Sequence, residues 1–353
     1  MQDLWEYLKE TSKPILIYGT GNGADKILDL FNEKSILVSD IFTSNDFFRE
    51  KDFRGFHLKP YSRIEKEYDD AIVVLAFAIF RDDMMSVIKE MNKRYEVISP
   101  CVSVFGTDYF SKDKLFTYKN EIREIYSMLA DEKSRQVFED LLKYRISGHL
   151  EPLLNAETDR LEVFKNIIKL SDKERYLDLG AYRGDTIEEF LSLTNSAFEE
   201  IAAFEPDSKN YKKLSEYLET LDDNISKKIK IFNYASYSKK QKLTFQGGGG
   251  RNSAIGDGKL TVNATDIDSM IRDERFSAPT LVKMDVEGAE HETIEGMKNL
   301  IANKAPMLMV SAYHRVTDLF TLPLLVRTIN PNYRVFLRHH TYVPDWETNY
   351  YFV

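Results

Sequence analysis

Short apolar runs alternate with helical patterns along most of the chain. In the first hundred residues, Pro14–Tyr18 is a continuous apolar run, which is typical of a strand buried on both faces of a parallel sheet. The glycine-rich turn Gly19–Gly23 follows, and then a helical pattern through Ile27 and Phe31. Further strands are predicted at Ser35–Val38, Ala71–Ala76 and Tyr95–Ile98. This alternation implies right-handed crossovers, so we expect a small parallel α/β domain at residues 1–110.

The pattern changes in residues 111–170, where charged and apolar positions interleave at helical spacing and predict two or three linking helices. A second α/β series fills residues 171–353. Its strands are predicted at Tyr176–Leu179, Ile201–Phe204, Ile229–Tyr234, Lys242–Gln246, Thr280–Met284 and Met307–Ala312, with a terminal antiparallel pair at Tyr333–Arg338 and Thr348–Phe352. Its first helices are predicted at Thr186–Leu193 and Ser208–Leu221, and Gly247–Gly250 as a flexible loop.

Composition and charge narrow the range of partners. The chain has 353 residues, of which 43% are hydrophobic and 30% charged, as in a folded globular protein. Its formal net charge is −9, whereas a protein that neutralises many phosphates carries a basic face, so we expect no nucleic-acid partner. The single cysteine, Cys101, excludes an internal disulfide and fits a reducing compartment. With no signal-peptide pattern and no long apolar run, we expect a cytoplasmic protein without membrane insertion.

The segment Tyr176–Thr186 is the strongest chemical signal. A hydrophobic strand runs into a turn that contains Gly180 and Gly184, and a helix follows. Glycines at this place let a ligand approach the backbone at the carboxyl end of the strand, where open α/β sheets bind their ligands. Glu205 ends the next strand, 21 residues after Gly184, and a carboxylate there can accept both ribose hydroxyls of an adenosine.

This pattern allows two kinds of adenosine cofactor, a dinucleotide with a pyrophosphate or S-adenosylmethionine with a sulfonium, and the charge of the nearby side chains distinguishes them. A pyrophosphate needs bare N–H groups at a helix N-terminus, but Asp178 before the turn and Asp185 after it would repel phosphates. The same carboxylates suit a ligand that bears an ammonium and a sulfonium. The glycine spacing is also Gly-x-x-x-Gly instead of Gly-x-Gly-x-x-Gly. Asp185 with Glu188 further predicts a capping box at the start of the helix.

A second acidic cluster follows the strand Thr280–Met284. Lys283 and Asp285 share one strand face, and Glu287 and Glu290 lie three residues apart on the first helical turn. Because a charge in an apolar strand is costly unless it is paired, Lys283 either pairs with one of these acids or serves the site. His314 follows the buried strand Met307–Ala312, at the edge where the site is expected. No ligand spacing requires a divalent ion, and we predict none.

At Tyr176–Thr186, Phe204–Pro206 and Lys283–Glu290, the chain resembles the FkbM family of methyltransferases. The resemblance covers about residues 174–353 and includes Asn233–Ser236, Tyr313–His314 and Leu337–His340. It implies a class I, Rossmann-like sheet of seven strands whose last strand pair is partly antiparallel. Phe42–Asn45 and Asp131–Arg135 are similar to segments of longer bacterial members, in which a smaller Rossmann-like α/β domain and linking helices precede the methyltransferase domain.

The resemblance implies S-adenosylmethionine as the cofactor and gives roles to the residues that match. Asp178, Gly180 and Gly184 would line its methionine end, Glu205 would bind the ribose, the turn Asn233–Ser236 would border the adenine, and Asp285 would lie beside the methyl group. The predicted cofactor-binding residues are therefore Asp178, Gly180, Tyr182, Gly184, Asp185, Thr186, Glu205, Pro206, Ala235, Ser236 and Asp285.

The same family implies transfer to a hydroxyl, so we expect O-methylation of a carbohydrate or another small metabolite. The acceptor would be a small molecule or a glycan, and the sequence allows a homo-oligomer. A neutral alcohol is a poor nucleophile, so a base is needed. We hypothesise that His314 is this base and that Asp285 orients the acceptor or the histidine. The predicted catalytic residues are His314, Asp285, Lys283, Glu287 and Glu290.

Two other classes of protein stay open at this point. The turn Gly19–Gly23, with Asp40 as a ribose acid, resembles the nucleotide-binding unit of sugar-modifying enzymes, which would fit an NAD-linked sugar-nucleotide oxidoreductase. The sequence has neither a Tyr-x-x-x-Lys motif nor a suitably placed cysteine, one of which that class of enzyme would need. The other class is a non-enzymatic, nucleotide-binding scaffold, in which the N-terminal unit serves packing or dimerisation.

Overall fold

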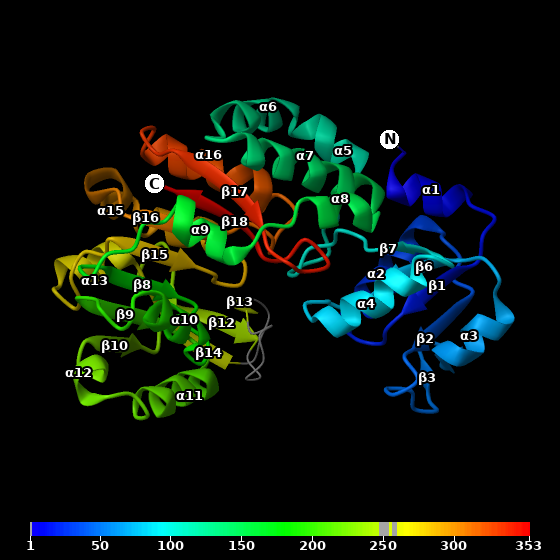
Figure 1. Cartoon of the computed structure of the whole chain (residues 1–353), viewed down its shortest axis with the longest axis horizontal. Coiled ribbons are helices and arrows are strands. Elements are labelled where there is room, and N and C mark those ends of the chain that lie inside the picture. The colour runs from blue at the N-terminus through cyan, green and yellow to red at the C-terminus, as the bar shows by residue number, and fades with distance from the viewer. Residues whose placement is uncertain (1, 247–253, 256–259) are drawn as a thin grey trace. The chain divides into compact units, whose positions relative to one another are not determined.

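The computed structural model describes residues 2–246, 254–255 and 260–353 (Figure 1). These residues form two compact units, and each unit gathers three separate stretches of the chain. Unit 1 consists of Met1–Ile122, Lys133–Thr158 and His339–Glu347. Unit 2 consists of Arg123–Glu132, Asp159–Arg338 and Thr348–Val353.

Unit 1 is built on a parallel sheet. Among the described residues this sheet has five strands in the order β5-β2-β1-β6-β7, all parallel to their neighbours. Its strands are β1 (Ile15–Tyr18), β2 (Asp40–Thr43), β5 (Lys59–Pro60), β6 (Ile72–Leu75) and β7 (Glu96–Ile98). A small antiparallel ribbon joins β3 (Asp52–Phe53) and β4 (Phe56–His57). Every residue of β1 and β6 is buried, as the continuous apolar runs predicted.

The helices of unit 1 bury amphipathic faces against this sheet and one another. The core includes Trp5, Ile17 and Phe31, from α1, β1 and α2. The helices are α1 (Leu4–Glu10), α2 (Asn22–Lys34), α3 (Tyr61–Glu67), α4 (Asp82–Met91), α5 (Lys112–Thr117) and α8 (Leu150–Asn155). Helices α6 (Lys119–Met128) and α7 (Glu132–Ser147) contain residues of both units. Gly148, with a φ of +71°, follows the end of α7, and the region is therefore divided into more helices than the two or three predicted.

The prediction of a strand at Ser35–Val38 was wrong, because the second strand begins at Asp40. Ser35 has a left-handed backbone with a φ of 58° and ends α2, and the N–H of Ile36 donates to the carbonyl of Phe31 at 2.8 Å. Leu37 is 85% exposed. The apolar residues there belong to the C-terminal connection of a helix, which has no two-residue periodicity.

Unit 2 contains a larger sheet. Within the described ranges it has seven strands in the order β10-β9-β8-β15-β16-β18-β17. The strands are β8 (Arg175–Leu179), β9 (Glu200–Phe204), β10 (Ile229–Phe232), β15 (Leu281–Met284), β16 (Met307–Ser311), β17 (Val335–His339) and β18 (Thr348–Phe352). The first five run parallel and β18 runs antiparallel to β16, which confirms the seven-stranded sheet with a partly antiparallel end.

Helices and a second sheet complete unit 2. The helices are α9 (Arg160–Asn166), α10 (Asp185–Leu193), α11 (Ser208–Leu218), α12 (Asp223–Ser226), α13 (Ile267–Arg272), α14 (Glu290–Glu295), α15 (Lys298–Lys304) and α16 (Asp318–Ile329). The second sheet contains β11 (Ala235–Ser236), β12 (Gln241–Gln246), β13 (Ala254–Ile255) and β14 (Leu260–Thr265). The predicted loop Gly247–Gly250 lies outside the described residues.

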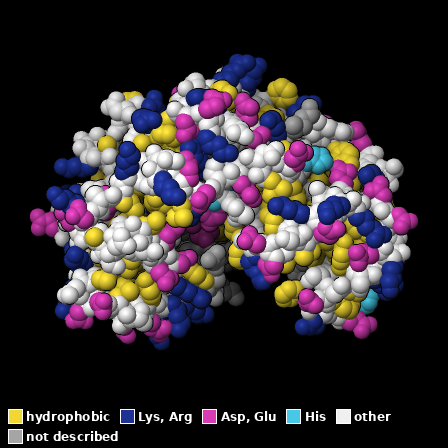
Figure 2. Space-filling view, in the orientation of Figure 1, with side chains coloured by type: hydrophobic (Ala, Val, Ile, Leu, Met, Phe, Trp, Pro, Cys, Tyr) yellow, Lys and Arg dark blue, Asp and Glu magenta, His cyan; other side chains and the backbone are white. Residues whose placement is uncertain are grey.

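The charges on the surface and the lengths of the helices relate to the expectations about nucleic acids and membranes. On the face drawn in Figure 2, Lys and Arg side chains are distributed among Asp and Glu side chains in both parts of the protein. In the part of the chain that the structure describes, no helix has the length and hydrophobicity needed to cross a membrane.

Candidate functional site

Gly180 brings the loop after β8 into direct contact with the backbone after β15. Its φ is +84°, and a Cβ placed on it would lie 1.9 Å from the carbonyl oxygen of Asp285. Its N–H donates to the carbonyl of Phe204 at the end of β9, at 3.0 Å. Only glycine fits here, and the turn is therefore fixed where the carboxyl ends of three parallel strands meet.

Helix α10 begins at Asp185, and the predicted capping box of Asp185 and Glu188 is wrong. The N-cap residue is Gly184, which has a left-handed φ of 99°, and among the described residues no side chain caps the helix by a hydrogen bond. An N-cap side chain works from an extended backbone, whereas Asp185 is already inside the first turn. Asp185 therefore contributes a negative charge at this helix end, with Thr186 beside it in the sequence.

Asp178 and Lys283 form a buried ion pair on the adjacent strands β8 and β15. The Nζ of Lys283 lies 3.3 Å from Oδ1 of Asp178 and donates to the carbonyl of Gly180 at 2.8 Å. The hydroxyl of Thr186 donates to the other oxygen of Asp178. Burial lowers the pKa of Lys283, but the charges of Asp178 and Asp285 outweigh it and raise this pKa above its ordinary value. The pair thus ties the Gly180 turn to the sheet, and the catalytic role predicted for Lys283 stays a prediction.

Glu205 lies directly after β9 and is 6% exposed. Its two carboxylate oxygens accept hydrogen bonds from the backbone N–H of Tyr182 at 2.9 Å and of Asp207 at 2.8 Å. Burial raises the pKa of Glu205 to about 7, although the two backbone hydrogen bonds act in the opposite direction. A carboxylate has about four acceptor positions, so lone pairs remain for two ligand hydroxyls.

The residues of the predicted adenine turn, Asn233–Ser236, make contacts in two different places. The side-chain amide of Asn233 donates to the carbonyls of Glu205 and Pro206, at 2.8 and 3.1 Å, and holds the turn that carries Glu205. Ala235 and Ser236 form the short buried strand β11. The hydroxyl of Ser236 lies 3.0 Å from that of Thr293 in α14.

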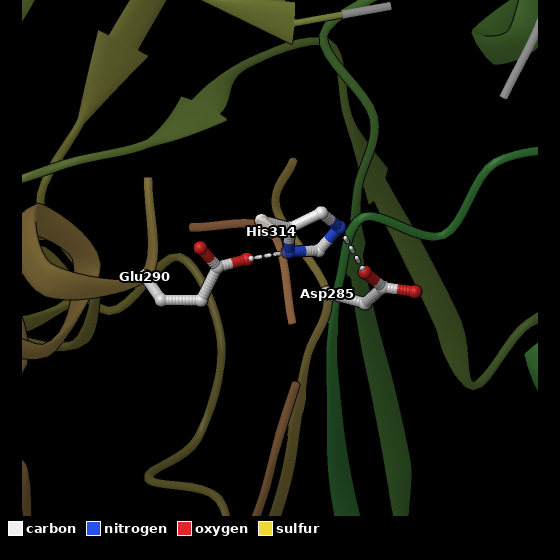
Figure 3. A group of neighbouring side chains, drawn as sticks. All are labelled: Asp285, Glu290 and His314. Atoms are coloured by element: carbon white, nitrogen blue, oxygen red, sulfur yellow. Dashed lines mark ion pairs between the residues drawn. The ribbon is translucent and has the colours of Figure 1, made fainter. Parts of the chain in front are cut away.

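Three carboxylates surround the imidazole of His314, which is 1% exposed. Figure 3 draws two of them, Asp285 and Glu290. Its Nε2 lies 3.3 Å from Oδ1 of Asp285 and 3.4 Å from Oε2 of Glu287, and its Nδ1 lies 2.9 Å from Oε1 of Glu290. Oε1 of Glu290 also accepts the backbone N–H of Val286 at 3.0 Å. The structure thus brings together four of the five predicted catalytic side chains at the ends of β15 and β16.

The charge state of His314 follows from these neighbours. Burial lowers its pKa, but the charges of Glu290 and Glu287 and the hydrogen bonds to them raise the pKa well above its ordinary value. For Asp285, burial raises the pKa, and the charges of Lys283 and His314 reverse this shift and lower it. The neighbouring carboxylates therefore favour the protonated form of the imidazole, which opposes a role of His314 as a base. Its predicted role as the base stays a prediction.

Two neighbours of this cluster were missing from the prediction. The hydroxyl of Tyr313 donates to Oδ1 of Asp285 at 3.2 Å. Asp318, which begins α16, is 4% exposed, and burial with the charge of Glu290 raises its pKa to about 7. In the sequence, Tyr313 forms part of the dipeptide Tyr313–His314 that resembles the FkbM family. Its position next to His314 was the signal that could have identified it.

Other side chains with potential chemistry have different surroundings. His291 is exposed, and His339 is fully buried in unit 1, where burial lowers its pKa to about 3. Cys101 is a free, buried thiol whose pKa is raised by burial, as expected of an inert cysteine. Asp40 begins β2, and its carboxylate pairs with Lys59 at 2.7 Å, so the structure does not place it at the carboxyl end of its strand.

Comparison with known proteins identifies the domain. A family model described as the methyltransferase FkbM domain matches residues 178–344. The solved structure of methyltransferase FkbM from Methylobacillus flagellatus KT is similar over 98% of this chain and 91% of its own, with a TM-score of 0.74 and 20% sequence identity. At this identity the similarity shows a common fold. No curated protein matches the chain.

Other solved methyltransferases are similar to only part of the chain. Fibrillarin from Aeropyrum pernix, solved with natively bound S-adenosyl-L-methionine, is 11% identical over 54% of this chain and 72% of its own, with a TM-score of 0.32. A putative rRNA methylase from Clostridium thermocellum is 9% identical over 55% and 94%, with a TM-score of 0.35. These scores are too low to carry an argument about function.

The residues matched by the family model contain the candidate site that the structure shows. The matched residues 178–344 include the Gly180 turn, Glu205 and the His314 cluster, and they contain most of the seven-stranded sheet. The full-length similarity extends this agreement to the fold of the whole chain. Residues 178–344 of the chain therefore carry a methyltransferase FkbM domain.

Proposed function

We propose that this methyltransferase uses S-adenosylmethionine and transfers the methyl group to a hydroxyl of a carbohydrate or another small metabolite. The observation that carries the cofactor assignment is the orientation of Glu205. Two backbone N–H groups hold its carboxylate at the carboxyl end of β9, the position at which such a residue accepts ribose hydroxyls. Asp185 in the first turn of α10 supports a cationic ligand over a pyrophosphate.

The proposed reaction is a displacement at the methyl carbon. The acceptor oxygen forms a bond to the methyl carbon while the bond from that carbon to the sulfonium sulfur breaks, which leaves a neutral thioether. The acceptor hydroxyl loses its proton. We assign this proton to the coupled cluster of Asp285, Glu287 and His314 as a unit, because groups that interact strongly titrate together. Asp285 and Glu287 are each 29% exposed at the side chain, so an acceptor can reach the cluster.

The cofactor assignment is tested by calorimetry. The wild-type protein should bind S-adenosylhomocysteine and S-adenosylmethionine but not NAD. Glu205→Ala should weaken this binding by about 1.5–3 kcal/mol for each ribose hydrogen bond that is lost. Glu216→Ala is the matched control, because Glu216 is a solvent-accessible carboxylate of α11 that pairs with Lys213. Binding of NAD without any response to S-adenosylhomocysteine would overturn the proposal.

The chemical assignment is tested with His314→Ala. With an acceptor found in a panel of glycosides and sugar nucleotides, turnover should fall by about 10²–10⁴-fold, the usual contribution of positioned acid–base groups. The affinity for S-adenosylhomocysteine should stay near that of the wild type. His57→Ala, which removes an exposed histidine of unit 1, is the control. Turnover of His314→Ala close to that of the wild type would remove the cluster from the mechanism.

A further inference from the structure

The side chains around His314 hold an excess of negative charge in a buried place. Asp285, Glu287 and Glu290 all contact the imidazole, and Asp318 lies nearby and acts on Glu290 electrostatically. Glu290 is 1% and Asp318 4% exposed. Three carboxylates contact one imidazole, while Lys283 and Arg160 act electrostatically on Asp285 and Arg315 acts on Asp318. Buried carboxylates that lack compensation are costly, so a further cation would stabilise this arrangement.

The lysine of the same strand supplies part of that charge, because Lys283 lowers the pKa of Asp285. The Nζ of Lys283 is already bound by Asp178 and by the carbonyl of Gly180. Asp178 is itself fully buried, so the lysine charge is matched there first.

The atoms of the cluster are arranged as ligand atoms of a metal are. One donor atom from each of Asp285, Glu290 and His314 lies within 4.8 Å of the other two. Figure 3 shows the imidazole between the two carboxylates, with Glu290 on the Nδ1 side and Asp285 on the Nε2 side. Glu287 faces Nε2 as well. A histidine that ligates a metal through one nitrogen usually donates its other N–H to a carboxylate, which is the place of Glu290 here.

We propose that the cluster of Asp285, Glu287, Glu290 and His314 is a binding site for one divalent transition-metal cation. Nε2 of His314 and the carboxylates of Asp285 and Glu287 are its ligands, and Glu290 fixes the imidazole through Nδ1. Carboxylates suit Mn²⁺ and imidazole suits Zn²⁺ or Fe²⁺, so the mixed set fits these ions better than Mg²⁺, which is normally held by oxygen atoms alone.

The consequence for the reaction rests on the proposed function. Asp285 and His314 follow the adjacent parallel strands β15 and β16, at the edge where the methyl group is expected. A bound divalent cation acts as a Lewis acid on an oxygen ligand and lowers its pKa. It would draw the acceptor hydroxyl to this edge and favour loss of its proton. The imidazole would then serve as a ligand, which explains why it is buried among carboxylates instead of being open to solvent.

The test is Mn²⁺ binding to the full chain after treatment with a chelator, without cofactor or acceptor. Electron paramagnetic resonance should show one bound Mn²⁺ per chain, and thermal unfolding should move to higher temperature as Mn²⁺ is added. His314→Ala and the isosteric Asp285→Asn should each abolish this binding. Glu290→Gln should weaken it by about 10–100-fold, as expected of a group that orients a ligand. The control is His57→Ala, because His57 forms an exposed pair with Asp52 at 3.0 Å and should not contribute.

The outcomes separate this proposal from the proposed function. Absence of bound Mn²⁺ and of bound Zn²⁺ in the wild-type protein would overturn the metal site, whatever the variants do. Equal Mn²⁺ binding by the wild type and Asp285→Asn would overturn it as well. If metal-free protein binds S-adenosylhomocysteine but never Mn²⁺, only the metal site fails. If it binds Mn²⁺ but never S-adenosylhomocysteine, only the cofactor assignment fails.

Discussion

The two units place a glycine-rich turn after a central strand of a parallel sheet, but they differ in the side chains at the strand ends. In unit 2 these positions carry Glu205, Asp285 and His314. In unit 1 they carry aromatic rings. The ring of Tyr18, the last residue of β1, stacks on that of Phe42 with 4.6 Å between the ring centroids. It also packs against Phe77 in a T-shaped arrangement, with 4.8 Å between the centroids.

The difference extends to the acidic residues. Glu205 keeps lone pairs for a ligand because it is held by backbone N–H groups, whereas Asp40 of unit 1 pairs with Lys59 and accepts a hydrogen bond from the hydroxyl of Tyr68. The topology of a parallel sheet thus determines where a site can be, and the residues that end the strands determine whether charged chemistry is available there. Similar glycine turns in the two units do not imply similar ligands.

The largest expected effect concerns the two glycine turns. Gly180→Ala should destabilise the protein by more than about 4 kcal/mol or prevent folding, because the added Cβ meets a backbone oxygen at 1.9 Å and the φ is positive. Gly21→Ala should cost about 1 kcal/mol or less, because a Cβ there meets no atom within 4 Å. Urea unfolding of both variants measures the difference. Equal stabilities would show that the turn of unit 2 is not held against β15.

Much of this comparison was predictable from the sequence. Buried parallel strands appear as continuous apolar runs, which placed β1, β6, β8 and β16 within a residue or two. The order of acidic residues after the strands also brought Glu205 and the Asp285–Glu290 segment to one edge, because the carboxyl ends of parallel strands meet there. Among the predicted strands, Ser35–Val38 was the exception, since these residues follow the end of a helix and leave Leu37 exposed.

The pairing of side chains could not be predicted. Lys283 was expected either to pair with an acid of the Asp285–Glu290 segment or to serve the site. The register between β8 and β15 sets it beside Asp178 instead, a partner that the sequence did not indicate. The charge on His314 depends on three carboxylates that converge on one ring, which no spacing in the sequence fixes. The left-handed backbone of Gly184 likewise decided where α10 begins, against the capping pattern of Asp185.

A second prediction compares the buried ion pairs of the two units. In unit 1, Nε of Arg145 lies 2.6 Å from Asp345, and both residues are nearly fully buried. Asp345→Asn should destabilise the protein by about 3–5 kcal/mol, because it leaves a buried guanidinium without its carboxylate. Asp178→Asn should destabilise unit 2 by a similar mechanism, and it should also weaken cofactor binding, because it releases Lys283 from the turn that carries Gly180.

Thermal unfolding and calorimetry with S-adenosylhomocysteine, performed on both variants, measure these two effects separately. Asp345→Asn should lower the melting temperature and leave the affinity of the remaining folded protein unchanged. A folded Asp345→Asn variant with weakened affinity would contradict the division of roles between the units.

The smallest expected effect is a pH dependence of cofactor affinity that originates in Glu205. Because burial raises the pKa of this carboxyl to about 7, most of it is protonated at pH 6 and ionised at pH 8. The ionised form accepts hydrogen bonds from ribose hydroxyls and the neutral form accepts them less well, so affinity should rise as the pH rises. The gain for S-adenosylhomocysteine between pH 6 and pH 8 should be about tenfold, which corresponds to about 1.4 kcal/mol.

Glu205→Gln should bind more weakly than the ionised wild type and show no such rise, while Glu216→Gln should keep it. A wild-type affinity that is flat across this range, or that falls as the pH rises, would mean that the carboxylate of Glu205 does not accept the ribose hydroxyls. The acidic strand end of unit 2 would then differ from the aromatic strand ends of unit 1 in structure but not in binding.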